Sequence, residues 1–254
     1  MFILETKRLG QAYQAGTEQR QYVLKDIDLQ IRKGEFVAVM GPSGSGKSTL
    51  LYALSGMEQA TEGQVWFGGR ELSGLSEQEL AGLRLRQMGF IFQQMFLLKN
   101  LNIEDNILLP AYYAKQSSRR KIHKQAEELM KRTGIAALAE REITEVSGGQ
   151  LQRAAICRAL INQPELLFGD EPTGALNSSS AAEIMEILAD IHASGTTLLL
   201  VTHDAKVAAR AERVLYMLDG SIAAEHRLGR CGESSGERKA REEQLSLWLK
   251  ELGF

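Results

Sequence analysis

A glycine-rich octapeptide constrains the fold of this chain more than any other segment of its sequence. It reads Gly-Pro-Ser-Gly-Ser-Gly-Lys-Ser over residues 41–48, and it directly follows the apolar run Phe36–Met40. Glycines allow a backbone to curl tightly, and a helical pattern begins at Lys47. The segment therefore predicts a buried strand, a tight loop and a helix in immediate succession.

This octapeptide matches the pattern G-x-x-x-x-G-K-[ST], which is typical of loops that bind nucleotide phosphates. Its N–H groups would point at phosphate oxygens, and the following helix would present its positive end to the same anion. We expect Lys47 to neutralise the β- and γ-phosphates of ATP and Ser48 to offer a hydroxyl to Mg²⁺. The predicted nucleotide-binding residues of this loop are Gly41, Ser43, Gly44, Ser45, Gly46, Lys47, Ser48 and Thr49. The alternative, a loop that only turns, is weak because residue usage gives a chance match in about 1% of such chains.

Two adjacent acids follow a second apolar run. Asp170 and Glu171 come at the end of Leu-Leu-Phe-Gly, residues 166–169, and ligands of parallel α/β sheets bind at the carboxyl ends of the strands. We expect Asp170 to hold Mg²⁺, directly or through water, and Glu171 to act as the general base for attack on the γ-phosphate. Adjacent carboxylates are also common as solvated turn residues, and it is the phosphate loop that favours the catalytic interpretation.

Composition excludes several other classes of protein. The 254 residues are 44% hydrophobic, which is enough for a substantial core, and 30 Lys and Arg nearly balance 32 Asp and Glu. The small net charge gives the chain no overall positive potential that would bind nucleic acid, so we expect no nucleic-acid partner. The longest apolar runs are strand-sized and too short to span a bilayer. Residues Met1–Arg8 have the wrong order of apolar and basic residues for a secretory signal, so we expect a cytosolic chain.

The two cysteines indicate neither a disulfide nor a metal site. Cys157 and Cys231 lie far apart in the sequence and outside any C-x-x-C pattern. We expect Cys157 to be a buried structural residue.

Short β-type runs alternate with helical patterns along most of the chain. The runs 36–40, 166–168 and 197–201 precede helical patterns that begin at Lys47, after Asn177 and near Asp204. This alternation predicts an α/β fold, with a mostly parallel sheet covered by helices, as in a P-loop NTPase core.

Two segments depart from this alternation. Ile3–Tyr13 and Tyr22–Ile31 alternate in strand fashion with Gly16 between them, which predicts an antiparallel β layer ahead of the core. Between residues 101 and 139 the strand signal disappears, and Ser118 and Gly134 would open and close a helix over residues 119–133. We interpret approximately residues 95–160 as a helical subdomain inserted into the core.

The C-terminal residues differ in composition from the rest. We assign residues 1–227 to an ATP-binding domain and residues 228–254 to a flexible Gly/Ser linker and an amphipathic tail. Leu245, Trp248, Leu249 and Leu252 would form one apolar stripe on a helix. We expect the stripe to pack against the chain's own domain, with docking on a partner as the alternative, and we expect the tail to supply no chemistry.

A third motif lies between the phosphate loop and the two acids. Val-Ser-Gly-Gly-Gln over residues 146–150, here named the signature segment, continues as Leu-Gln-Arg153. The signature segment follows the phosphate loop and precedes the two acids, and these motifs in this order resemble the nucleotide-binding domain of ABC transporters. The resemblance extends from about Ile3 to Glu225. The resemblance implies that Ser147 and Gly149 contact the γ-phosphate bound by a second copy, so that a homodimer closes on two ATP molecules. Ser147 would also suit the N-terminus of the helix that holds residues 154–160.

Three further residues take roles from the resemblance. Tyr13 resembles the aromatic residue that stacks on adenine, and Gln93 resembles the glutamine that touches Mg²⁺ or the attacking water. His203 resembles the histidine that contacts the γ-phosphate. Taken alone, a tyrosine usually packs, a glutamine usually lies on the surface and a histidine is usually structural. The resemblance thus implies the catalytic set Glu171, His203 and Gln93, and the Mg²⁺ ligands Ser48, Gln93 and Asp170.

Two positions depart from the family pattern. Val146 replaces a leucine, which preserves apolar packing, and Asn177 stands where most relatives carry an aspartate that reaches across the dimer. The segments 89–93, 101–110 and 173–178 look most like the branch of lipoprotein-releasing, macrolide-exporting and antimicrobial-peptide-resistance transporters, and Asn177 favours the peptide-resistance group.

The resemblance predicts an ATPase subunit that powers an integral membrane permease from the cytoplasmic face of the membrane. One alternative is a soluble ABC-type ATPase of DNA repair or translation, which would usually carry a long coiled coil or a second nucleotide-binding domain. Another is a P-loop kinase, which would leave the signature segment unexplained.

Overall fold

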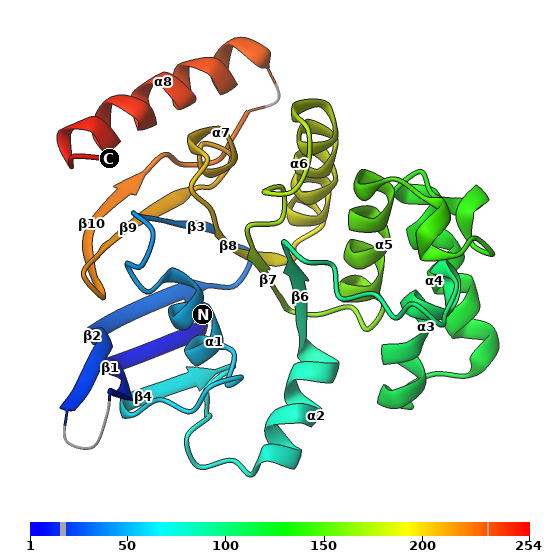
Figure 1. Cartoon of the computed structure of the whole chain (residues 1–254), viewed down its shortest axis with the longest axis horizontal. Coiled ribbons are helices and arrows are strands. Elements are labelled where there is room, and N and C mark those ends of the chain that lie inside the picture. Colours follow the sequence, from blue (N-terminus) through cyan, green and yellow to red (C-terminus); the bar gives the residue numbers. More distant parts are fainter. Residues whose placement is uncertain (16–18, 233) are drawn as a thin grey trace. The chain divides into compact units, whose positions relative to one another are not determined.

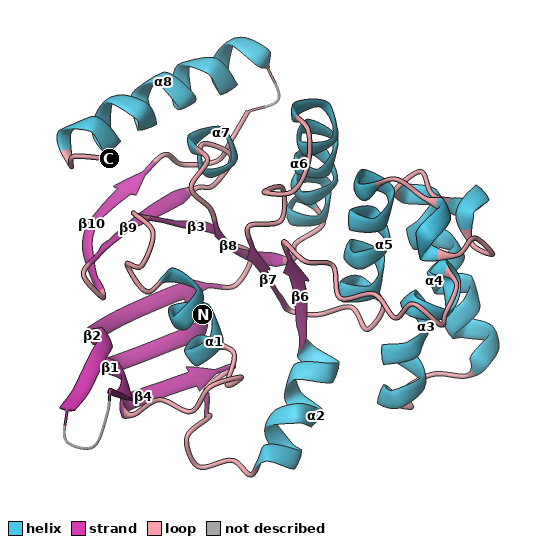
Figure 2. Cartoon of the chain, viewed as in Figure 1, coloured by secondary structure: helices cyan, strands magenta, loops and turns pink. Residues whose placement is uncertain are grey.

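The computed structural model describes residues 1–15, 19–232 and 234–254, and Gly16 lies outside the described residues. The chain divides into two compact units. The first unit comprises Met1–Leu80 and Thr197–Phe254, and the second comprises Ala81–Thr196. Helix α2 (Glu77–Gln87) runs across this boundary. Figure 1 follows the chain by residue number, and Figure 2 separates its helices from its strands.

The first unit begins with the predicted antiparallel layer. Its strands lie in the order β2-β1-β4-β5, and they span β1 (Phe2–Ala15), β2 (Gln19–Arg32), β4 (Glu62–Phe67) and β5 (Arg70–Glu71). The β1–β2 register shifts between Thr6 and Leu9, where a bulge interrupts the ladder. The Thr6 hydroxyl bridges this irregularity, because it donates to Ile27 O at 2.8 Å and accepts from Leu29 N at 2.9 Å.

Four more strands of the first unit form the sheet that carries the octapeptide. They lie in the order β10-β9-β3-β8, and they span β3 (Phe36–Met40), β8 (Thr197–Val201), β9 (Arg213–Leu218) and β10 (Ser221–Arg227). Strand β3 pairs in parallel with β8 and β9, whereas β10 pairs antiparallel with β9. Every residue of β3 and β8 is buried, as in parallel strands covered on both faces. The mostly parallel α/β sheet is confirmed.

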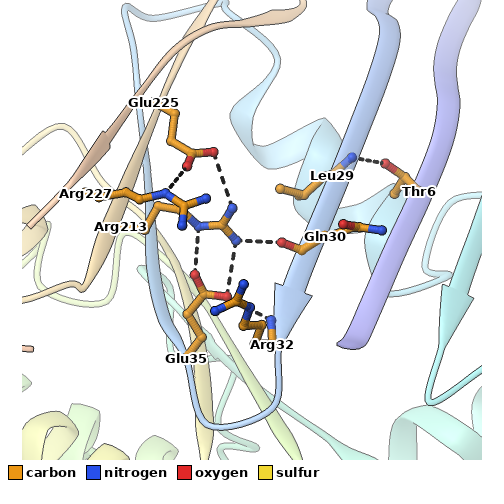
Figure 3. Close-up of polar contacts among 8 residues, drawn as sticks. All are labelled: Thr6, Leu29, Gln30, Arg32, Glu35, Arg213, Glu225 and Arg227. Atoms are coloured by element: carbon orange, nitrogen blue, oxygen red, sulfur yellow. Dashed lines mark hydrogen bonds and ion pairs between the residues drawn. The ribbon is translucent and has the colours of Figure 1, made fainter. Parts of the chain in front are cut away.

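A buried arginine ties the two sheets of the first unit together. Arg213 on β9 forms an ion pair from Nε to Glu35 Oε1 at 2.8 Å and a second from Nη1 to Glu225 Oε2 at 3.3 Å. Its Nη2 also donates to Gln30 O of β2 at 2.6 Å. Figure 3 shows these groups converging from β2, β9, β10 and the turn before β3. Because the side chains of Arg213 and Glu35 are 9% and 14% exposed, water can replace little of this network.

We expect Arg213→Ala to lower the free energy of unfolding by about 3 kcal/mol, because it leaves the buried Glu35 carboxylate without its partner. Chemical denaturation monitored by circular dichroism would measure the loss. Arg70→Ala is the matched control, since the Arg70–Glu79 pair is about half exposed (54% and 49%) and should contribute less than about 1 kcal/mol. Equal losses in the two variants would contradict a stabilising role for the buried network.

The second unit contains a parallel strand pair and a group of helices. Strands β6 (Met88–Phe92) and β7 (Leu166–Asp170) pair in register from Met88↔Leu166 to Phe92↔Asp170. The helices are α3 (Ile103–Ala114), α4 (Arg119–Arg132), α5 (Gly148–Leu160) and α6 (Ser178–Ala193), with short 3₁₀ turns at Ala136–Leu138 and Ile143–Glu145. Ser118 caps α4 as predicted, and the helix ends at Arg132 before Gly134 adopts a left-handed φ of 72°. Helices α3, α4 and α5 share one apolar core.

Cys157 lies in that apolar core. It is fully buried beside the Thr133 hydroxyl, 3.1 Å away. Burial raises the pKa of the Cys157 thiol to about 12. The expected structural role is confirmed.

The C-terminal tail packs on its own unit, as expected. Helix α8 (Ser235–Glu251) buries Leu245 and Leu249, and Trp248 stacks on His226 of β10 with ring centroids 5.0 Å apart. Trp248 also meets Tyr216 of β9 edge to face. The helix begins inside the stretch expected to be a linker, because Ser234 accepts a hydrogen bond from Glu237 N and caps the first turn.

Candidate active site

The octapeptide forms the expected strand, loop and helix. It connects β3 to α1 (Lys47–Leu54). Gly41 adopts φ +151°, and a Cβ added there would lie 2.2 Å from Met217 O of β9. Gly46 adopts φ +97°, and its Cβ would lie 2.8 Å from Val23 O of β2. These close approaches explain why glycine is needed where the loop leaves β3 and where it enters α1.

The loop has the features of a phosphate cradle. In the described chain no side chain caps the N-terminus of α1, where Gly46 occupies the capping position. The first N–H groups of the helix are therefore placed for an anion. Lys47 Nζ donates to the loop carbonyls Gly41 O and Pro42 O at 2.9 and 2.8 Å. The Ser45 hydroxyl is buried and has no hydrogen-bond partner within the described residues. A nucleotide phosphate fits both the charge and the donors of this loop.

Tyr13 and His203 belong to the same unit as the loop. Tyr13 is 41% exposed, and its hydroxyl donates to Glu58 Oε2 at 2.6 Å. Burial and the Glu58 hydrogen bond raise the pKa of Tyr13. His203 is exposed and follows β8, whose Val201 pairs with Val39 of β3. The structure therefore places His203 at the same sheet edge as the loop.

The second unit brings Gln93 and Glu171 together. Phe92 and Asp170 are paired at the ends of β6 and β7, so the residues that follow them leave the sheet side by side. A Cβ added to Gly174 would lie 3.0 Å from Gln93 Nε2 and 3.1 Å from Glu171 Oε2. An amide and a carboxylate thus converge at the carboxyl edge of the strand pair, next to Asp170.

The Glu171 backbone is strained. It has a φ of 48°, in the left-handed region that a residue with a Cβ rarely adopts. Such strain typically clusters at sites where a side chain must be aimed.

A buried glutamine that sequence reasoning missed holds this arrangement. Gln152 of α5 is 1% exposed, and its Nε2 donates to Phe92 O at 3.3 Å and to Pro172 O at 2.8 Å. Those carbonyls flank the predicted catalytic pair, one residue before Gln93 and one residue after Glu171. Gln152 lies on the face of a helix that otherwise buries Ala155, Ile156 and Cys157, and only knowledge of that face distinguishes it from a surface residue.

The signature segment forms the N-terminus of α5. Ser147 caps the helix, accepting from Gln150 N at 3.4 Å while its own N–H donates to Gln150 Oε1 at 2.8 Å. Ser147 remains exposed. A Cβ on Gly149 would lie 3.0 Å from Ser180 Oγ, so this glycine also permits α5 to approach α6. Asn177 caps α6 by accepting from Ser180 N at 2.9 Å.

The segment after Gln93 exposes apolar side chains while its backbone is fixed. Phe96 and Leu98 are 63% and 45% exposed. Arg158 of α5 donates to Met95 O and Phe96 O, both at 2.6 Å. Phe96 also has a left-handed φ of 48° and packs edge to face on Phe92. No sequence pattern predicts that Arg158 holds this segment, because the hydrogen bonds join residues more than 60 positions apart.

The described residues contain neither a cluster of metal-ligating side chains nor a membrane-spanning helix. No group of three or more His, Cys, Asp and Glu side chains could hold a metal ion. No helix there is both long and apolar enough to cross a membrane.

The α/β core, the inserted helices and the phosphate loop define a P-loop nucleotide-binding domain. A sequence profile described as "ABC transporter" matches residues 24–174, so the chain belongs to the ABC transporter family, as the ATP-binding cassette with its ATPase fold. The predicted family and enzyme class are confirmed.

Several relatives are export proteins. The chain is 45% identical over 225 residues to the macrolide export ATP-binding/permease protein MacB of Agrobacterium fabrum, covering 89% of this chain and 34% of the relative. It is 47% identical over 210 residues to MacB 1 of Aeromonas hydrophila subsp. hydrophila, covering 83% and 32%. The chain thus spans about a third of the length of these relatives.

Solved cassettes share the fold. A dimeric post-hydrolysis state of the cassette MJ0796 bound to ADP and Pi superposes with a TM-score of 0.83 and 37% identity, covering 89% of this chain and 98% of the other. The cbiO1 protein of Clostridium perfringens, part of the transporter complex cbiONQ, gives 0.81 and 25% identity, covering 99% and 95%.

Proposed function

We propose that this cassette hydrolyses ATP with Mg²⁺ through the predicted site residues. Lys47 and the loop N–H groups hold the phosphates, and Tyr13 stacks on the adenine. Ser48, Gln93 and Asp170 would hold Mg²⁺, which would neutralise phosphate charge as a Lewis acid. Hydroxyl, amide and carboxylate oxygens are the ligands that this ion prefers, so the residues fit it. The convergence of Gln93 and Glu171 beside Gly174 is the observation that carries this proposal.

Each catalytic side chain has its own task in this proposal. Glu171 accepts a proton from the attacking water, and Gln93 orients that water. His203 donates a hydrogen bond to the γ-phosphate, which helps to stabilise the charge that develops during transfer.

We infer that two copies complete the reaction. Ser147 is exposed at the N-terminus of α5, where a hydroxyl and helix N–H groups suit an anion bound by the other copy. The dimeric cassettes among the similar structures support this inference. ATP then holds the dimer together, and hydrolysis releases it.

We propose that the cassette powers an integral membrane permease at the cytoplasmic face of the membrane. The exposed Phe96 and Leu98 support a docking surface, because the Arg158 hydrogen bonds hold their segment in place without burying it. The names of the MacB relatives join the ATP-binding and permease functions in one protein. Antimicrobial-peptide resistance or export is the role that the resemblance favours, and the permease would select the cargo.

The alternative is a soluble ABC-type ATPase without a permease. We expect the tagged chain, purified from detergent-solubilised membranes of its own host, to retain an integral membrane protein. Phe96→Asp should reduce this retention at least about tenfold, because a charge cannot be buried in an apolar interface without a partner. Basal ATPase activity of the isolated chain should stay within about twofold.

Leu247→Asp is the matched control, because Leu247 on α8 is also 63% exposed. It should leave retention unchanged. A wild-type chain that retains no membrane protein would favour the soluble ATPase instead.

A further inference from the structure

The C-terminal helix inserts one arginine into the core of the first unit. Arg241 is only 6% exposed. Its Nε donates to Ala209 O at 2.9 Å and its Nη2 to Ala211 O at 2.7 Å. Nη1 donates to Leu228 O at 2.8 Å and Arg230 O at 3.3 Å, and Nη2 also donates to Gly229 O at 3.1 Å. A guanidinium has five N–H donors, and each has a main-chain carbonyl oxygen here.

Ala209 O and Ala211 O lie at the end of the segment that begins with His203. Helix α7 (Ala205–Ala208) starts directly after His203-Asp204, and Ala209 is its C-terminal cap. Asp204 N donates to the Thr202 hydroxyl at 3.0 Å, and Asp204 Oδ1 accepts from Lys206 N at 2.8 Å, which fixes the start of the helix. Ala209 N donates to Ala205 O at 2.8 Å. Residues 202–204 and the one-turn helix α7 therefore separate the Arg241 contact from the end of β8.

Arg241 supplies the hydrogen bonds of the residues that directly follow α7. The carbonyls of Val207 and Ala208 accept from main-chain N–H groups, whereas those of Ala209 and Ala211 accept from Arg241. Buried main-chain carbonyls just beyond a helix end need a donor as much as those of the helix itself. Two donors of one rigid fork reach Ala209 O and Ala211 O, so their relative positions are fixed. Val207 and Ala208 are buried, so a shift at this end would be transmitted along packed side chains rather than absorbed by solvent.

We propose that Arg241 is a positioning residue for ATP hydrolysis. Arg241 fixes the position of α7 relative to the end of β8. The position of α7 in turn fixes where His203 lies at the sheet edge. The C-terminal helix thus affects the rate of ATP hydrolysis, although it contacts none of the reacting groups. This inference rests on the role proposed above for His203.

The test compares steady-state ATPase kinetics of the full chain and its variants. Arg241→Ala should lower kcat about tenfold, because small misplacements of a catalytic group are costly, while KM and ADP affinity stay within about twofold. His203→Ala should lower kcat about 10²-fold. In the His203→Ala background, Arg241→Ala should have no additional effect on kcat, since both changes remove one contribution.

Leu249→Ala separates positioning from tail stability. Leu249 is 2% exposed on the same helix, so its loss should lower the melting temperature to a similar degree as Arg241→Ala. It should leave kcat within about twofold of wild type. Equal kcat losses in Leu249→Ala and Arg241→Ala would overturn the proposal, as would an unchanged kcat in Arg241→Ala.

The remaining outcomes distinguish the two proposals. An Arg241→Ala effect of equal size with and without His203 would leave the histidine role intact and overturn the inference about Arg241. Wild-type kcat in His203→Ala would overturn the histidine role and this inference with it. If circular dichroism shows that Arg241→Ala is unfolded, Arg241→Lys takes its place in the same cycle, because it keeps the charge and loses the fork.

Discussion

Replacing Glu171 with glutamine is expected to leave ATP binding intact and to slow hydrolysis by about 10²-fold or more. Glutamine has nearly the same shape, so the convergence with Gln93 beside Gly174 is retained. Its amide cannot accept a proton from water as the carboxylate does. The ATP-bound dimer should therefore accumulate, as measured by size-exclusion chromatography with ATP and by single-turnover hydrolysis.

Glu128→Gln provides the control for loss of a carboxylate. Glu128 on α4 is exposed and pairs with Lys124 one turn away. This variant should hydrolyse ATP at the wild-type rate. If Glu171→Gln turned over within a few-fold of wild type, Glu171 would not be the general base.

Replacing Ser147 with arginine is expected to lower the rate of ATP hydrolysis by about 10²-fold. Each chain should still bind nucleotide. A long cationic side chain at the exposed start of α5 would obstruct closure over the γ-phosphate held by the second copy. The phosphate loop of the same chain is untouched. Titration with a fluorescent ATP analogue and an ATPase assay would measure the two properties separately.

The matched control is Ser118→Arg, which removes an equivalent helix cap. Ser118 and Ser147 each accept from the N–H three residues on, at 3.4 Å in both cases. Each replacement should cost about 1 kcal/mol in capping, so stability loss is matched. Ser118→Arg should keep its ATPase activity. Full activity in Ser147→Arg would show that the sites are not shared between copies.

The sequence predicts the central strands well because their signal is local. Strands β3 and β8 coincide with the apolar runs 36–40 and 197–201, since parallel strands buried on both faces require continuous apolar residues. The glycines of the loop were also predicted, although the atoms that require them belong to β2 and β9, far away in the chain. The assignment of residues 1–227 and 228–254 as domain and tail stays a prediction.

The polar residues that support the site could not be predicted in the same way. Gln152 and Arg241 act on carbonyl groups distant in sequence, Gln152 on Phe92 O and Pro172 O, and Arg241 on Ala209 O and Ala211 O. Their side chains look like ordinary surface residues until the helix faces are known. Periodicity predicts which residues are apolar and buried, but it cannot tell which buried carbonyl needs a donor.

Burial of Cys157 leaves Cys231 as the cysteine available for selective labelling of the unmodified chain. Burial raises the pKa of the Cys157 thiol, so almost none of it is the reactive thiolate near pH 7, and its side chain is fully buried. Cys231 is half-buried and lies next to Arg230, whose carbonyl receives one of the Arg241 hydrogen bonds. A maleimide dye would therefore label the native sequence at Cys231. Its fluorescence would report whether the C-terminal helix stays packed on its unit during the ATPase cycle.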